Sequence, residues 1–282
     1  MPKALSPQQV EQYRSRGYVA PLPAVSAARA AEILARLEAQ ERAEGGRLSL
    51  RPNRRPHLLL VCLVDFIRHP RILDGVEDVI GPDILCWGSS FFAKNAHDPA
   101  FVSWHQDATY WGLSRPDVVT AWVALTPSTR ASGCMRAIPG SHLADQRPHR
   151  DTFAPDNLLS RGQEVAVAVD EARAVDIELQ PGEMSLRDVE LVHGSEPNRA
   201  GHRRVGFAIR YISTAVRQVA GTVDSATLVS GRDAYGHFLP EPRPARDFDP
   251  EAAAFHARMF DAGNQVSYRE AAQVPAEAAP PR

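Results

Sequence analysis

Cysteine is scarce in this 282-residue chain. The three that occur, Cys62, Cys86 and Cys134, lie far apart and form no C-x-x-C pair. An odd and sparse set of cysteines argues against a disulfide framework and favours reduced thiols in an intracellular protein. The sequence therefore predicts a cytoplasmic chain held together by a hydrophobic core.

Long apolar runs are missing as well. The longest, Leu58–Val64, is too short to cross a bilayer, which takes about 20 apolar residues in a helix. The N-terminal segment has no basic stretch followed by an apolar one, so it does not read as a signal peptide. These absences predict a soluble protein with no membrane partner.

Neither sign of charge dominates. The chain has 32 basic and 34 acidic residues, a formal net charge of −2 and a pI near 6.6. That balance gives no electrostatic attraction for nucleic acid or for an anionic membrane. An apolar fraction of 44% is typical of a folded globular chain. We expect small-molecule partners and a monomer or homodimer.

The first 82 residues are expected to be mostly helical. Ser6, Pro7 and Gln9 together form a helix-start signal. The clearest helix, Ser26–Glu44, has an apolar stripe. Its members are Ala31, Ile33, Leu34 and Leu37. Further helices are predicted at Val61–Arg68 and Pro70–Ile80. The basic, proline-broken stretch Leu48–His57 is interpreted as a solvated loop, with a grip on an acidic substrate group as the alternative.

From Asp83 onward the pattern changes to short β-type runs separated by Pro, Gly, Asp and Ser. The predicted strands are Ile84–Ala93, Phe101–Thr109, Val118–Leu125, Met135–Ile138, Val165–Val169, Val175–Leu179, Glu183–Arg187 and Val205–Ile212. Helices followed by strands with no helices between them predict an antiparallel β-sandwich or barrel with helices on one face. A last helix is predicted at Pro250–Phe260, and the final VPAEAAPPR has the composition of a frayed tail.

The clearest chemical motif is Trp-His-Gln-Asp at 104–107. Residues i and i+2 of a strand point to the same face, so His105 and Asp107 are expected to project together. With a third ligand from another strand they would form a His₂-carboxylate set, which leaves adjacent positions on iron open. An H-x-D tripeptide is common by chance. Its alternative is a strand whose two side chains meet solvent or each other.

A second segment, which begins at His193, makes the metal interpretation more specific. Arg204 follows His193 by eleven residues and opens a strand-like run. One face of that strand presents Arg204, Gly206, Ala208 and Arg210. Two guanidinium groups beside two very small residues are hard to explain as core. They indicate a cavity wall that binds anions.

Together these segments resemble the phytanoyl-CoA dioxygenase family of Fe(II)/2-oxoglutarate-dependent oxygenases. The matching pieces lie between Ile84 and Tyr211 and are WHQD, Trp122 in TAWVAL, PGSH at Pro139–His142, HGS at His193–Ser195, and Arg204. The resemblance implies a mainly β fold with flanking helices, a double-stranded β-helix (jelly roll) like that of cupins. The chain is then a single catalytic domain over 1–282. Its expected parts are a helical flank at 1–82, a jelly-roll core at 83–214, and a C-terminal extension at 215–282 with a disordered tail.

The resemblance also implies roles for individual residues. The iron ligands are matched by His105, Asp107 and His193. Arg204 matches the arginine that pairs with the distal carboxylate of 2-oxoglutarate. Ser195 matches the hydroxyl beside it, and Trp122 a wall of the same pocket. The alternative for Ser195 is a hydrogen-bonding residue in a turn.

The implied reaction uses Fe(II), 2-oxoglutarate and O₂. The cosubstrate is decarboxylated to succinate and CO₂, and an unactivated C–H bond of the substrate is hydroxylated. Similar enzymes that halogenate carry Ala or Gly in place of the carboxylate ligand, so Asp107 favours hydroxylation. Desaturation and ring formation stay open. Fold-level analogy does not identify the substrate.

Four residues are expected to contact the substrate. Trp111 follows the metal motif and is placed at the cavity mouth, where aromatic side chains pack ligands. Phe92 and Lys94 lie on a strand that reaches toward the site, although a solvated surface lysine is the alternative for Lys94. Arg210 is the candidate for binding a substrate anion. Histidines without ligand spacing, expected on the surface or in loops, are His57, His69, His97, His149, His202, His237 and His256.

Two other functions stay open. A cupin-like metalloenzyme or zinc hydrolase would use the same two histidines and aspartate, but Arg204 and the H-x-D…H order argue against it. An inactive jelly-roll binding module would keep the fold without turnover, but the intact ligand set argues against that. Release of succinate in the presence of substrate separates both alternatives from the oxygenase.

Overall fold

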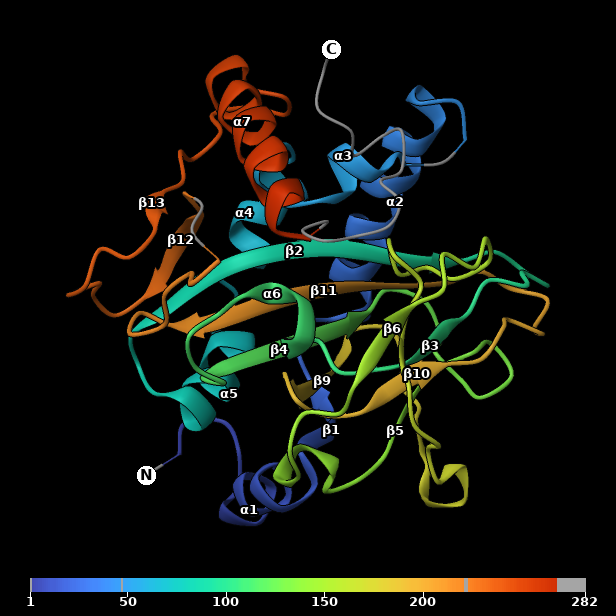
Figure 1. The fold of residues 1–282 in the computed structure, drawn as a ribbon. Coiled ribbons are helices and arrows are strands. Elements are labelled where there is room, and N and C mark those ends of the chain that lie inside the picture. The colour runs from blue at the N-terminus through green and yellow to red at the C-terminus, as the bar shows by residue number, and fades with distance from the viewer. Residues whose placement is uncertain (1, 47, 221–222, 268–282) are drawn as a thin grey trace.

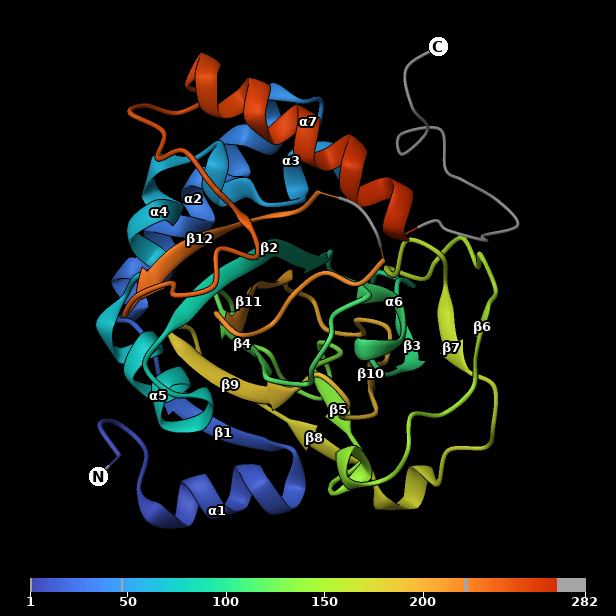
Figure 2. The same ribbon diagram turned by 60° about the vertical axis from the view of Figure 1, so that its left-hand side comes forward.

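Two β-sheets pack face to face in the computed structural model, which describes residues 2–46, 48–220 and 223–267 (Figures 1 and 2). The major sheet has the order β1 (Tyr18–Pro23), β9 (Glu183–Asp188), β4 (Val118–Ala124), β11 (Arg204–Ser213), β2 (Ile84–Lys94), β12 (Ser225–Ser230), β13 (Leu239–Pro240). The minor sheet has the order β3 (Val102–His105), β10 (His193–Ser195), β5 (Met135–Ala137), β8 (Val175–Ile177). All pairs except β12–β13 are antiparallel. A separate hairpin of β6 (His149–Asp151) and β7 (Gln163–Val165) lies beside the minor sheet.

The helices α2 (Ala27–Ala43), α4 (Val61–Phe66) and α5 (Pro70–Ile80) cover the outer face of the major sheet (Figures 1 and 2). α1 (Pro7–Arg16) lies by the β1 edge, and α3 (Leu50–Asn53) and α7 (Pro250–Ser267) lie toward the opposite edge. α6 (Ala108–Trp111) lies between the sheets and contacts α7, and short 3₁₀ turns occur at Pro56–Leu58, Ser141–Leu143 and Glu171–Arg173. α1 begins with the predicted capping box, in which Ser6 and Gln9 satisfy each other's backbone N–H. The predicted helices Val61–Arg68 and Pro70–Ile80 correspond to α4 and α5.

The two faces of β11 divide the molecule. The outward face packs in the largest apolar cluster against α2, α4 and α5, and consists of Val205, Phe207, Ile209 and Tyr211. The inward face carries Arg204, Gly206, Ala208 and Arg210, as the alternation predicted. Gly206 is required there, because a Cβ atom would lie 1.8 Å from the ring of Trp122. The small residues on this face thus leave room for an aromatic wall.

Several expected elements differ in the structure. The stretch Leu48–His57 is not a solvated loop: it contains α3 and a 3₁₀ turn, and Arg55 within it is nearly buried. Only the first residue of the expected strand Val165–Val169 is in a strand, and its partner β6 was not predicted. In α2 the predicted Ile33 and Leu37 are buried, but the buried alanine is Ala30, one position before the predicted Ala31, which is exposed. The expected frayed tail lies outside the described residues.

The difference at Leu48–His57 has a physical cause, which is a buried polar network between distant segments. The carboxylate of Glu241 accepts hydrogen bonds from His57 at 3.0 Å, Thr227 at 2.6 Å and Arg55 at 3.1 Å. Arg55 also donates to Asp224 at 2.6 Å. The network ties the N-terminal flank to the segment after residue 214. Such long-range pairs have no local sequence signature.

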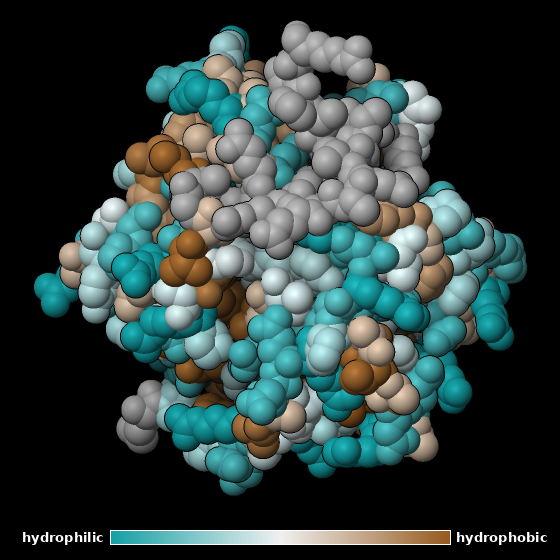
Figure 3. Space-filling view, viewed as in Figure 1, coloured by the Kyte–Doolittle hydropathy of each residue, from teal (hydrophilic) through white to brown (hydrophobic). Residues whose placement is uncertain are grey.

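The surface is polar in character. On the face drawn in Figure 3, hydrophilic residues predominate and the apolar ones form small separate groups, which is usual for a protein surface. Among the helices of the described residues, none combines the length and the apolarity that a membrane-spanning helix needs.

We expect Glu241→Gln to lower the free energy of unfolding by about 3–5 kcal/mol near pH 7, because it leaves a buried guanidinium with one partner fewer. Burial alone would raise the pKa of Glu241, but its bonds with His57, Arg55 and Thr227 lower it to about 2. The stabilisation is therefore present above the unfolded pKa of about 4.3 and lost as the pH falls toward 2.

Urea unfolding of wild type and variant near pH 7 and near pH 3 measures this effect. The difference in free energy of unfolding between wild type and variant should be smaller near pH 3 than near pH 7. Glu251→Gln, at an exposed carboxylate, is the matched control. An equal loss of stability at both pH values would contradict the prediction.

Candidate metal centre

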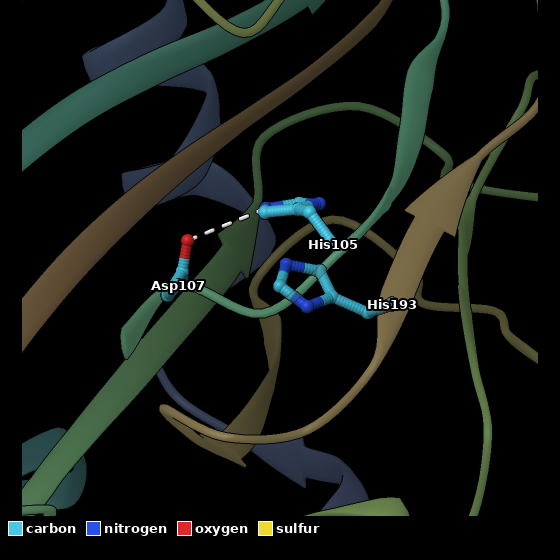
Figure 4. Close-up of side chains that lie close together, drawn as sticks. All are labelled: His105, Asp107 and His193. Atoms are coloured by element: carbon cyan, nitrogen blue, oxygen red, sulfur yellow. Dashed lines mark ion pairs between the residues drawn. The ribbon is translucent and has the colours of Figure 1, made fainter. Parts of the chain in front are cut away.

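His105, Asp107 and His193 converge between the two sheets (Figure 4). His105 ends β3 and His193 begins β10, and the two residues are direct partners in the antiparallel pairing of those strands. Their ring centroids lie 4.1 Å apart, and His105 Nε2 is 3.3 Å from Asp107 Oδ1. One candidate ligand atom from each of the three side chains lies within 4.8 Å of the others, and all three residues are buried. The group is compact enough to hold one metal ion.

Asp107 reaches this position by a different route from the one the sequence suggested. The expected strand Phe101–Thr109 ends at His105, and Asp107 has helical angles (φ −62°, ψ −36°) directly before α6. The argument from i and i+2 alternation was therefore wrong, although both side chains do face the same point. A turn, and not a strand, brings the carboxylate beside the imidazole.

Gln106 holds that turn in place. Its side chain is fully buried, donates to the Glu190 carbonyl at 2.7 Å and accepts from the Arg147 N–H at 2.8 Å. Its backbone N–H donates to His149 Nε2 at 2.9 Å. These three hydrogen bonds fix Gln106 to the segments around it. They thereby also fix its neighbours His105 and Asp107.

Both histidines use Nδ1 for a hydrogen bond to the backbone, which leaves Nε2 of each to face the centre. Nδ1 of His105 donates to the Ser103 carbonyl and Nδ1 of His193 to the Leu191 carbonyl, each at 2.9 Å. A carbonyl only accepts, so the proton sits on Nδ1 and Nε2 keeps its lone pair. Burial, together with the charge of Arg187, holds the pKa of His193 well below its usual value. The imidazole is therefore neutral, as a metal ligand must be.

Arg187 is the partner of the carboxylate. Its Nη1 lies 2.5 Å from Asp107 Oδ2, and both side chains are nearly buried. Burial would raise the pKa of Asp107, but Arg187 and the two histidines outweigh burial and hold it well below the usual range. Sequence reasoning missed Arg187. The available signal was an arginine placed between Leu186 and Asp188 on a strand of otherwise buried residues.

Two imidazoles and one ionised carboxylate form the facial donor set that suits Fe(II) with open coordination positions. The residues present therefore fit a mononuclear iron ion. The hydrogen bonds to Ser103, Leu191 and Arg187 would orient the three ligands.

A cavity of about 750 Å³ opens onto this centre. Several residues that the sequence singled out line it, namely Phe92, Trp111, Trp122, Ser195, Arg204 and Arg210. The cavity also reaches α7 through Phe260 and α3 through Leu50. Its size leaves space for two organic ligands beside a metal.

Arg204 and Trp122 form one wall. The Arg204 guanidinium lies over the Trp122 ring at 4.4 Å from its centroid, and Nε donates to Ser128 Oγ at 3.3 Å. In the described part of the chain no carboxylate lies within ion-pair distance of Arg204. Burial lowers the pKa of this group to about 10, so it stays charged near neutral pH. A buried cation without a counter-ion is suited to an anionic ligand.

Lys94 lies behind Ser195. It is fully buried, so the alternative of a solvated surface lysine is wrong. Its ammonium donates to Ser195 Oγ at 2.6 Å and to the Glu196 carbonyl, and it is not among the residues that line the cavity. Burial and the nearby Arg204 charge lower its pKa to about 7. This geometry therefore does not support the expected direct contact between Lys94 and the substrate.

The expectation that the remaining histidines lie on the surface or in loops is wrong for three of them. His57 and His256 are buried. His57 bonds to Glu241, and His256 Nε2 lies 2.6 Å from the Arg54 carbonyl. His149 is part of β6 and supports Gln106. Each has a structural partner that only the folded chain reveals.

A family model described as phytanoyl-CoA dioxygenase (PhyH) matches residues 2–206. A probable alpha-ketoglutarate-dependent hypophosphite dioxygenase of Stutzerimonas stutzeri is 26% identical over 189 residues, 65% of each chain. The match thus spans just under two thirds of that relative's length.

Solved structures are similar over more of the chain. The non-heme monooxygenase ThoJ, in its apo form, is 36% identical with a TM-score of 0.82, covering 93% of this chain and 98% of that one. CytC3 with Fe(II) and alpha-ketoglutarate is 26% identical with a TM-score of 0.64, covering 87% and 96%. These likenesses confirm the predicted jelly roll. With the family match over most of its length, the chain belongs to the phytanoyl-CoA dioxygenase family.

Proposed function

We propose that this protein is an Fe(II)- and 2-oxoglutarate-dependent dioxygenase that hydroxylates an unactivated C–H bond of a small molecule and releases succinate and CO₂. The observation that carries the proposal is the buried His105–Asp107–His193 set, which opens onto a cavity lined by Arg204, a cation with no counter-ion among the described residues. Two of the similar proteins are described with alpha-ketoglutarate, one of them also with Fe(II). A hydrolase on the same fold would not need that cation.

Iron held by the three ligands would supply O₂ activation coupled to decarboxylation of the cosubstrate. The protein supplies the remaining parts. Arg187 occupies Asp107 Oδ2, which leaves Oδ1 facing His105 Nε2 and the centre. Burial of the ligand set keeps bulk water away from the reacting atoms.

The cosubstrate would extend from the metal toward Arg204. A guanidinium pairs bidentately with a carboxylate, and Arg204 has donors to spare because, among the residues that the structure describes, only its Nε is used. Trp122 would pack beside the carbon chain. Ser195 is held by Lys94 at 2.6 Å, so its hydroxyl can donate onward to the same carboxylate. Lys94 would then act on the cosubstrate through Ser195.

The substrate would occupy the rest of the cavity. Phe92, Trp111 and Arg210 line it, and they would pack and orient the bond to be oxidised. The intact carboxylate Asp107 favours hydroxylation over halogenation. The cytoplasmic location and the monomeric or dimeric state remain predictions.

His105→Ala should abolish turnover of 2-oxoglutarate, because two ligands bind the metal too weakly. Purified protein is reconstituted with Fe(II) and screened with a metabolite library for succinate release. His202→Ala, at an exposed histidine outside the cluster, is the control and should keep wild-type activity. If no compound triggers succinate release from the wild-type protein, the proposed function is wrong.

Arg204→Ala should raise the KM for 2-oxoglutarate about 10- to 100-fold, the loss expected for a charge-assisted bond. Iron affinity should change much less. Arg199→Ala, at an exposed arginine five residues earlier, is the matched control. An unchanged KM in the Arg204 variant would assign the cosubstrate carboxylate to Arg210, because Glu41 already occupies Arg203 bidentately.

Arg187→Met should weaken metal binding about 10- to 100-fold, since the partners of metal ligands orient them. Titration with Co(II), followed by absorbance, measures this without turnover. Arg187→Lys should recover part of the affinity because it restores the charge. Wild-type Co(II) affinity in the methionine variant would show that Asp107 does not depend on Arg187.

A further inference from the structure

Six arginines line the cavity. Arg54 donates to Asn264 Oδ1 at 2.6 Å, and the other five divide into two classes. Arg187 pairs with Asp107, Arg55 with Asp224 and Glu241, and Arg203 with Glu41. In the described part of the chain, Arg204 and Arg210 have no carboxylate within ion-pair distance. The proposed function gives Arg204 an anion to bind. It leaves Arg210 without one.

Arg210 lies at the opposite end of the site from Arg204. Six residues along one strand separate their Cα atoms by roughly 20 Å. Strand pairing places Arg210 beside Thr120 on β4, and Thr120 beside Arg187 on β9. Arg210 therefore shares a row across the sheet with the partner of Asp107. Asp107, which is bonded to Arg187, thus lies toward the Arg210 end of the cavity, away from Arg204.

The surroundings of Arg210 are those of a ligand subsite. The guanidinium is half-buried, lies over the Trp111 ring at 5.5 Å from its centroid, and donates to Ser90 Oγ at 3.0 Å. Burial lowers its pKa, which shows the cost of holding this charge away from water. One neutral hydroxyl satisfies one of five N–H donors. Within residues 2–46, 48–220 and 223–267 no other acceptor bonds to this guanidinium, so its remaining donors can reach a ligand.

Aromatic side chains extend this subsite. The rings of Trp111 and Trp87 lie 5.2 Å apart, and Trp87 Nε1 donates to Asp224 at 2.6 Å, which fixes its orientation. Both tryptophans line the cavity. A cation beside two fixed aromatic rings matches a molecule with an anionic group and an apolar body.

We propose that Arg210, with Trp111 and Trp87, binds the carboxylate end of the substrate, and that the substrate is a monocarboxylic acid with an apolar body. The inference rests on the proposed function for the position of the oxidised bond. A single guanidinium fits a monoanion, because Arg187 is already neutralised by Asp107. The planar fork of Arg210 matches a planar carboxylate. With the carboxylate held on the Asp107 side, the body of the acid crosses in front of the metal ligands.

Binding without turnover tests the proposal. Protein loaded with Ni(II) and saturating 2-oxoglutarate is titrated calorimetrically with benzoate, phenylacetate, indole-3-acetate and hexanoate, and with the primary amide of each. At least one acid should bind ten-fold or more tightly than its amide. Arg210→Gln should remove that preference, and Arg210→Lys should keep part of it. Arg115→Gln, at an exposed arginine paired with Asp117, should behave as wild type.

The inference is overturned if no acid binds more tightly than its amide, or if the preference survives in Arg210→Gln. Thermal unfolding of each variant shows whether it is folded. The same titrations without 2-oxoglutarate separate the two proposals. If the cosubstrate does not bind but the acid preference and its loss in Arg210→Gln remain, the proposed function fails and the carboxylate subsite stands. If the cosubstrate binds and the preference for the acid is absent, the carboxylate subsite fails and the proposed function stands.

Discussion

The ion pair between Arg187 and Asp107 joins the two sheets at the point where the chemistry is expected. Arg187 belongs to β9 of the major sheet. Asp107 comes two residues after His105, which ends β3 of the minor sheet. Both are nearly buried, so neither charge is tolerable without the other. The pair therefore does two things at once. It holds the sheets in register around the metal centre, and it keeps a carboxylate ionised where burial would otherwise favour its protonated form.

This constraint explains which parts of the site could be predicted from sequence. The alternating face that starts at Arg204 follows from local strand geometry, and the structure shows the expected face. His193 was assigned through the family resemblance, because no strand was predicted at that position. Asp107 was placed correctly for the wrong reason, because its position depends on Gln106 and on contacts with residues about 40 and 80 positions away. The interpretation of Lys94, as a substrate contact or a solvated surface lysine, is the clearer failure of the sequence analysis. Nothing local distinguishes a buried lysine from a surface one, since its partners come from Gly133 and Ser195 after folding.

In the fold, too, features with a local sequence signal could be predicted, and features that depend on distant contacts could not. Helices with caps and strands with alternating residues were found, because their signals lie within one segment. The basic stretch around Arg55 was misread, because its charge suggested solvent while its partners Asp224 and Glu241 lie about 170 to 190 residues later. A run of arginines predicts exposure only when no distant carboxylate is available to it. Charge that is buried in pairs has to be recognised from the structure.

Pairing also gives a criterion for function. A buried arginine with a carboxylate partner has a structural explanation, and one without a partner requires another explanation. Arg204 and Arg210 are on the inward face of β11, on either side of the small residues Gly206 and Ala208. Those residues leave room for Trp122 on one side and for a ligand on the other. A strand that offers two cations with no counter-ions in the described part of the chain, both lining the cavity of the metal centre, is organised to align two anions. The second anion is then a property of the substrate, which the metal ligands alone do not specify.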